Sequence, residues 1–169
     1  MDYSTHAIAW QALYATLGGS AAALIGLLFV GLSLHLHTIV ATPEHTARAR
    51  ETFGGLLSLV VLSILLLIPG QERWALGGEL LVGGLMLALV GGWLNLQTLR
   101  KLTPRVRLRW TVRLAVLHLG TAGVLLAGIS LLVEQPGGLY WLVLTVVIYL
   151  TWSLFNVWLL VVHIARQES

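Results

Sequence analysis

The sequence contains no cysteine and little charge, and both absences narrow what the chain can be. Without cysteine there is no disulfide, no thiolate metal site, no redox pair and no lipoprotein-type anchor. Charged residues make up 10% of the 169 residues, whereas apolar residues make up 57%, and the mean hydropathy is +0.88. This composition lies outside the soluble globular class. We therefore expect a membrane protein without a soluble catalytic domain, and not an enzyme.

Long apolar stretches free of Asp, Glu and Lys occur five times along the chain. Each can hold a helix of the ~20 residues needed to cross ~30 Å of hydrocarbon. Thr-Pro and Pro-Gly pairs between the stretches are typical of helix starts and helix ends. The sequence thus predicts an all-α transmembrane bundle, a single domain over residues 1–169, with five helices at about 9–40, 43–68, 74–99, 105–134 and 139–165.

The basic residues orient this bundle. When the five helices are threaded through a bilayer, nine of the ten Lys and Arg residues fall on one side and only Arg73 falls on the other. Cytoplasmic loops are rich in Lys and Arg. We therefore place the N-terminus outside and the C-terminus in the cytoplasm, as in a multi-pass membrane protein.

The densest positive charge lies in the cytoplasmic connection between the third and fourth helices. These basic residues flank apolar helices and do not alternate with exposed aromatic residues along a groove, so no nucleic acid partner is expected. Contact with anionic lipid headgroups is expected, at ~1 kcal/mol per residue near the surface. The alternative is an anion funnel or a docking patch for a soluble partner. The residues concerned are Arg100, Lys101, Arg105, Arg107, Arg109 and Arg113.

Small residues recur on one face of three predicted helices at the helical period. Such faces let membrane helices approach closely, within one chain or between copies. Because these faces exceed what five helices can satisfy among themselves, a homo-oligomer is expected. The stripes are Gly19, Ala23, Gly26, Val30, Ser33 and His37 on the first helix, Gly77, Gly84, Gly91 and Asn95 on the third, and Gly120, Gly123, Ala127, Ser130 and Glu134 on the fourth.

The last helix carries a polar and aromatic face. In hydrocarbon its hydroxyl and amide groups would lose hydrogen bonds at a cost of several kcal/mol each. We expect this face to avoid lipid. It comprises Thr145, Tyr149, Trp152, Ser153, Asn156 and His163.

Two ionisable residues, Glu79 and His118, lie inside the predicted spans, where such groups are functional candidates. Glu79 lies near the outer interface on a face that is polar at both ends and apolar between them, which is typical of a gated pore lining. The alternative is an interfacial carboxylate that bonds Arg73 or a helix end. The other residues of that face are Gly83, Met86, Val90 and Gln97.

A polar layer is also predicted in the cytoplasmic leaflet. Its histidines are compatible with a proton relay, haem ligation or transition-metal binding. The alternative, which we prefer, is that each is an ordinary hydrogen-bonded or interfacial residue near a helix end. His35 and His37 project about 200° apart and cannot face one metal together. Because no spacing is specific for a ligand, no cofactor and no metal is assigned. The layer comprises His35, His37, Asn95, His118, Asn156 and His163.

The segments Ala21–Leu34 and Leu67–Gln71 are similar to a group of small bacterial integral membrane proteins. Some of these proteins are labelled as modulators of a membrane-anchored AAA protease. The resemblance covers about the first 80 residues and implies a protein of the bacterial plasma membrane.

Three functions remain open on the sequence. The leading hypothesis is passage of a small ion or proton through a homo-oligomeric channel lined by the third or fifth helix. The alternative is a non-enzymatic regulatory or scaffold subunit that binds another membrane protein. The third is a haem- or metal-binding membrane redox protein.

Overall fold

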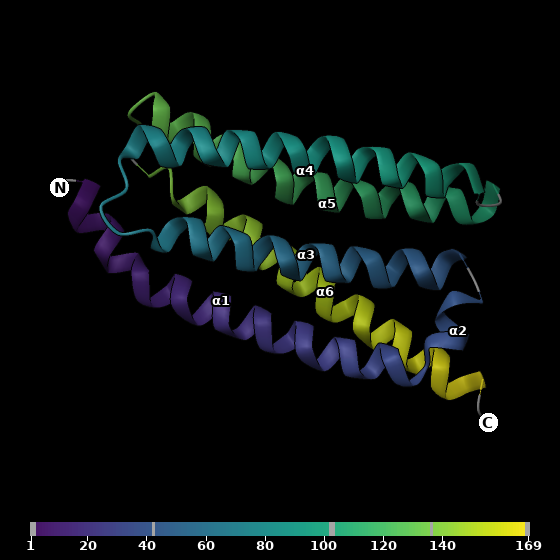
Figure 1. Ribbon diagram of the computed structural model, residues 1–169. Helices are drawn as coiled ribbons and strands as arrows, with labels where there is room; N and C mark the ends of the chain where they lie inside the picture. The colour runs from purple at the N-terminus through teal and green to yellow at the C-terminus, as the bar shows by residue number, and fades with distance from the viewer. Residues whose placement is uncertain (1–2, 42, 102–103, 136, 168–169) are drawn as a thin grey trace. The chain divides into compact units, whose positions relative to one another are not determined.

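The computed structural model describes residues 3–41, 43–101, 104–135 and 137–167, excluding the side chains of residues 3–9, 38, 101, 104–109, 112, 160 and 163–167. Throughout these ranges the regular structure is helical (Figure 1). The six helices are α1 (Tyr3–Leu34), α2 (Leu36–Val40), α3 (Pro43–Leu67), α4 (Arg73–Lys101), α5 (Pro104–Leu132) and α6 (Tyr140–Gln167).

Five of the helices are long and apolar enough to cross a membrane, and only α2 is short. The spans are 10–34, 43–67, 73–100, 113–132 and 140–159. This is the architecture of a multi-pass integral membrane protein. It confirms the prediction of an all-α fold with five membrane-length helices.

The first helix departs from its expected range of 9–40 because it is interrupted at His35. His35 has φ −118° and ψ 26°, and its N–H donates to Leu32 O at 3.2 Å. After this break, α2 packs on α3, where Thr46 Oγ1 donates to Ile39 O at 3.0 Å. Ile39 is buried against Ala49 and Leu32. Because the helix is interrupted at His35, α2 can change direction and bury Ile39 against α3.

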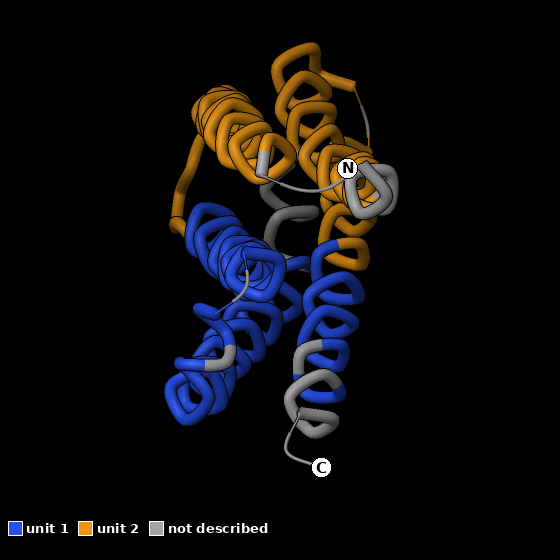
Figure 2. Tube along the Cα trace, turned by 90° about the vertical axis from the view of Figure 1, so that its right-hand side faces the viewer, with its two compact units in different colours: residues 1–67, 149–169 blue, residues 68–148 orange. Residues whose placement is uncertain are grey.

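The chain forms two compact units, coloured separately in Figure 2. Unit 1 comprises residues 1–67 and 149–169, and unit 2 comprises residues 68–148. Helix α6 contributes its first part to unit 2 and the remainder to unit 1.

In unit 1, α1 packs along α3. A Cβ added to Gly18 would lie 2.8 Å from Ser63 Cβ, so the two helices meet closely at this level. Tyr14, Ala21 and Leu59 are among the buried side chains on either side of this contact. Glycine permits the approach because any larger residue would displace Ser63.

In unit 2, α4 packs along α5, and the predicted stripe of α4 lies at this contact, whereas on α5 the glycine at the contact is Gly128, which lies outside the predicted stripe. Gly77 lies against Gly128, and a Cβ added to Gly84 would lie 2.8 Å from Leu125 Cδ2. Gly123 of α5 instead faces α6, where it contacts Thr145 Oγ1. The prediction of helix packing is confirmed for Gly77 and Gly84 of α4, which meet α5, and for Gly120 and Gly123 of α5, which meet α6, whereas Gly91 has open space around it.

The C-terminal end of α5 is capped by backbone hydrogen bonds. Gln135 N–H donates to Ser130 O at 3.0 Å, and Glu134 N–H donates to Leu131 O at 3.4 Å. Glu134 has φ 61°, the left-handed conformation that this 6→1 and 5→2 pattern of hydrogen bonds requires. These bonds satisfy carbonyl groups at the helix end before the chain reaches α6.

Candidate functional site

Polar side chains gather at three places in the described structure, and each place lies within one unit. We call them the rim cluster (Gln71, Arg73 and Glu79), the hairpin cluster (Asn95, Thr98, Trp110 and Arg113) and the α3–α6 cluster (Glu51, Thr52, Ser153 and Asn156). In a chain of membrane-length helices, such groups are the first candidates for function.

The rim cluster is built around Glu79, one of the two predicted ionisable residues of the spans. Glu79 Oε2 accepts a hydrogen bond from Gln71 Nε2 at 2.6 Å. Arg73 Nε donates to Leu131 O at 2.8 Å. The first bond ties the segment before α4 to that helix, and the second joins the start of α4 to the end of α5. In the described structure the partner of Glu79 is therefore Gln71, whereas Arg73 bonds the end of α5 and not Glu79.

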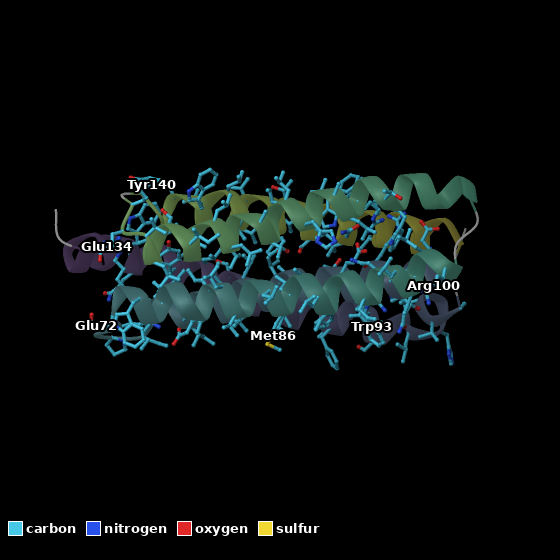
Figure 3. All side chains as sticks on the ribbon, turned by 90° about the horizontal axis from the view of Figure 1, so that it is seen from above. Glu72, Met86, Trp93, Arg100, Glu134 and Tyr140 are labelled. Atoms are coloured by element: carbon cyan, nitrogen blue, oxygen red, sulfur yellow. The ribbon has the colours of Figure 1, made fainter. Side chains whose placement is uncertain are left out.

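The α4 face that begins at Glu79 does not pack on α5. Met86, Val90 and Gln97 are exposed, and Figure 3 shows Met86 and Trp93 on the outer side of α4. Glu79 and Gln97 are separated by about 27 Å at the helical rise. This matches the ~30 Å of hydrocarbon in a bilayer. The face therefore suits lipid contact within one chain, and it can line a pore only between copies.

The hairpin cluster lies near the opposite end of α4 and α5, where Arg100 is located (Figure 3). The register set by the Gly77–Gly128 and Gly84–Leu125 contacts, when continued, brings Asn95 level with Arg113. By the same register, Thr98 is level with Trp110. All four side chains are buried. The cluster is thus a polar level inside unit 2 that also holds a buried cation.

Arg113 and Trp110 contact each other directly. The Arg113 Cζ atom lies 4.5 Å from the centroid of the Trp110 ring. Trp110 is 1% exposed and Arg113 is 9% exposed. A guanidinium over an indole face is attracted by the ring quadrupole, and desolvation strengthens that attraction. On Thr98, in the same cluster, Oγ1 donates to Leu94 O at 3.0 Å.

The α3–α6 cluster surrounds a close approach in unit 1. A Cβ added to Gly55 would lie 3.0 Å from Ser153 Oγ. About one turn from this contact, Thr52 on α3 and Asn156 on α6 are both fully buried. Glu51 is also buried, next to Thr52. A carboxyl group, an amide and hydroxyl groups are therefore enclosed at neighbouring levels of the two helices.

The described residues of the polar and aromatic face of the last helix are buried or half-buried, as predicted, and the side chain of His163 lies outside the described residues. Thr145, Tyr149, Ser153 and Asn156 are buried, and Trp152 is half-buried. Thr145 Oγ1 donates to Gly120 O at 3.0 Å and to Trp141 O at 3.3 Å. The face thus avoids lipid by contacting other helices.

The structure describes most, but not all, side chains of the predicted polar layer. His118 and His37 are exposed, His35 is half-buried with Nδ1 3.3 Å from Gly31 O, and the side chain of His163 lies outside the described residues. Asn95 and Asn156 are buried in unit 2 and unit 1, respectively. In the described part of the chain, no group of three or more His, Cys, Asp or Glu residues is placed to hold a metal ion.

The residues of the basic run between the third and fourth predicted helices differ in exposure. Arg100 is exposed and Arg113 is buried. The side chains of Lys101, Arg105, Arg107 and Arg109 lie outside the described residues. Arg113 therefore differs from the exposed Arg100, since its side chain is buried.

Sequence reasoning missed five residues of these clusters: Glu51, Thr52, Gln71, Thr98 and Trp110. Thr52 could have been found from the helical period, because it shares one face with Leu56, Leu59 and Ser63, which are all buried. Glu51 borders an apolar stretch and does not lie within it, so the search for ionisable residues inside the spans did not include it. Its burial depends on the packing of unit 1, which hydropathy does not report.

We compared the chain with protein-family models, with curated proteins and with solved structures, and no match was found in any of the three comparisons.

Proposed function

We propose that the protein is a non-enzymatic integral membrane subunit that regulates or scaffolds another membrane protein through an exposed face of α1. The observation that carries this proposal is the small-residue stripe of that helix. Gly19, Ala23 and Gly26 are exposed, and a Cβ added to either glycine would meet nothing within 4 Å.

The α1 stripe lies on the side of the helix away from its buried side chains. At 100° per residue, the direction of Ala23 and Gly26 is about 180° from that of the buried Tyr14, Ala21 and Leu28. In unit 2, comparable stripes on α4 and α5 serve close helix contacts. The α1 stripe supports a similar contact with a helix from outside the unit. His37 no longer extends this stripe, because it belongs to α2.

Membrane topology and family resemblance fit this role. On the distribution of Lys and Arg, we place the N-terminus outside and the C-terminus in the cytoplasm, and the family resemblance implies a bacterial plasma membrane. The resemblance of the first 80 residues to small membrane proteins labelled as protease modulators also favours a regulatory subunit. In this role the chain acts by contact, either as a homo-oligomer or in complex with a different protein.

The absence of cysteine allows a direct test by site-specific crosslinking. Gly26→Cys and Gly31→Cys each introduce one thiol at an exposed glycine with open space around it. The two positions point about 140° apart on α1. After labelling with a maleimide photo-crosslinker in native membranes, we expect a discrete protein adduct from Gly26→Cys and mainly lipid adducts from Gly31→Cys.

The adduct mass identifies the partner. A mass equal to two or more copies of the chain indicates a homo-oligomer, and any other mass indicates a different membrane protein. Equal protein adducts from both positions, or none from Gly26→Cys, would contradict the proposal.

A second candidate function is an ion or proton channel formed by several copies. The observation that favours it is the exposed α4 face, which is apolar between Glu79 and Gln97. If copies assemble around this face, Glu79→Gln should change cation selectivity in liposomes while folding is retained. Flux from folded wild-type protein equal to that of empty liposomes would contradict a channel and leave the regulatory proposal intact.

A further inference from the structure

His118 presents an imidazole on the outer side of α5. Between Ala115 and Leu132, the other exposed side chains of this helix are all apolar. Ala127 and Leu131 of the same helix are buried, and they point about 140–180° away from His118. His118 therefore lies on the side of α5 that faces out of unit 2.

Two exposed tryptophans on α4 mark the depth of unit 2 in the bilayer. Trp74 is 68% exposed and Trp93 is 61% exposed, and exposed tryptophan side chains concentrate at the two membrane–water interfaces. The two residues are about 28 Å apart at the helical rise, close to the ~30 Å of hydrocarbon in a bilayer. The exposed α4 residues between them are all apolar or glycine. This part of α4 therefore spans the hydrocarbon.

His118 lies inside this hydrocarbon layer. The register of the glycine contacts between α4 and α5, when continued, brings His118 about level with Leu89. Leu89 precedes Trp93 by one helical turn, or about 6 Å. In its neutral form an imidazole has one hydrogen-bond donor and one acceptor, and hydrocarbon offers a partner to neither. His118 is therefore costly on a lipid-facing surface, and contact with a polar group of another protein would remove that cost.

The residues around His118 form a seam on which another helix can pack. Thr111, Ala115, His118 and Ala122, which we call the α5 seam, follow one another at intervals of four, three and four residues. This is the spacing of contacts in left-handed helix pairs. Thr111 and Ala115 are exposed, and Ala122 is half-buried. Alanine one turn before and one turn after His118 lets a neighbouring backbone approach the imidazole closely.

We propose that the α5 seam binds the same seam of a second copy of the chain, with the two His118 imidazoles in contact. Copies in one membrane share one orientation, so a two-fold axis along the membrane normal places each seam residue opposite itself at the same depth. The N–H of one imidazole then donates to the unprotonated ring nitrogen of the other. A different protein would need its own polar group at this depth, whereas a second copy supplies one by symmetry. The seam lies on a different helix from the α1 face of the proposed regulatory contact.

Thiol crosslinking in native membranes would test the pairing, because the chain has no cysteine of its own. Ala115→Cys introduces a thiol on the α5 seam and leaves His118 in place. Leu96→Cys, at an exposed position near Trp93 on α4, is the control at a similar depth. With a short bifunctional maleimide, we expect an adduct of twice the chain mass from Ala115→Cys and little from Leu96→Cys. No adduct from Ala115→Cys, an adduct of any other mass, or equal adducts from both positions would overturn the proposal.

Variants of His118 test the role of the imidazole. His118→Leu removes both hydrogen-bonding groups and should weaken dimerisation in liposomes about threefold to thirtyfold, the equivalent of one hydrogen bond between membrane helices. His118→Gln keeps a donor and an acceptor and should retain most of the dimer. Because the contact joins two folded chains, circular dichroism should show the same helical content in each variant. The proposal is also overturned if folded His118→Leu protein dimerises like the wild type.

Discussion

Gly77 and Gly128 bring the backbones of α4 and α5 into direct contact. A Cβ added to Gly128 would lie 2.9 Å from Gly77 O, and a Cβ added to Gly77 would lie 3.1 Å from Gly128 O. No side chain separates the two helices at this level. Because lipid is as apolar as the helix surfaces, close packing of this kind is what holds membrane helices together.

The first prediction concerns this contact. Gly128→Ala should lower the free energy of unfolding by about 1–3 kcal/mol, since the added methyl group must displace the backbone of α4. Alanine is a better helix former than glycine. A loss of stability in Gly128→Ala would therefore come from packing and not from helix propensity. Thermal unfolding in detergent measures it. The control is Gly83→Ala, at an exposed position with open space, which should leave stability unchanged or higher.

The second prediction concerns the contact of α6 with α5. Thr145 Oγ1 donates to Gly120 O at 3.0 Å and contacts Gly123. Thr145→Val replaces this hydroxyl group with a methyl group at the same crowded position. We expect a loss of about 1–2 kcal/mol in stability. Thr151→Val, at an exposed position on the same helix, should change stability little, and equal losses at both positions would contradict the packing argument.

The five long helices and two of the three small-residue contacts could be predicted from the sequence, because length, hydropathy and helical phase are local properties. The break at His35 could not, since it depends on the contact of Ile39 with Ala49 across a turn of the chain. The exposure of His118 could not be predicted either. Both sides of α5 are apolar, so hydropathy does not distinguish the side that packs from the side that faces outward.

The candidate site was predicted less completely than the fold. Asn95 and Asn156 were identified as polar residues within spans, and both are buried. Trp110 was not identified, because an aromatic residue near a membrane interface ordinarily anchors a helix in the headgroup region. Its functional interest comes from the position of Arg113 over its ring. That relationship is set by side-chain conformations and not by spacing alone.

The third prediction is the orientation in the membrane. Gly137 and Arg100 are both exposed and lie at opposite ends of unit 2. Gly137→Cys should react with an impermeant maleimide in intact spheroplasts, whereas Arg100→Cys should react only after permeabilisation. The chain contains no cysteine of its own to give a background signal. Labelling of Arg100→Cys in intact spheroplasts would contradict an external N-terminus.

The last prediction compares two polar residues that sequence reasoning placed in one layer. Asn156 is 0% exposed, so Asn156→Leu, which is close to isosteric, should remove buried hydrogen-bonding groups and destabilise the protein by about 1–2 kcal/mol. His118 is exposed, and His118→Leu should be neutral or stabilising, because leucine replaces an imidazole on an outward-facing apolar surface. Thermal unfolding of both variants in detergent tests this difference, and a larger loss for His118→Leu would contradict it.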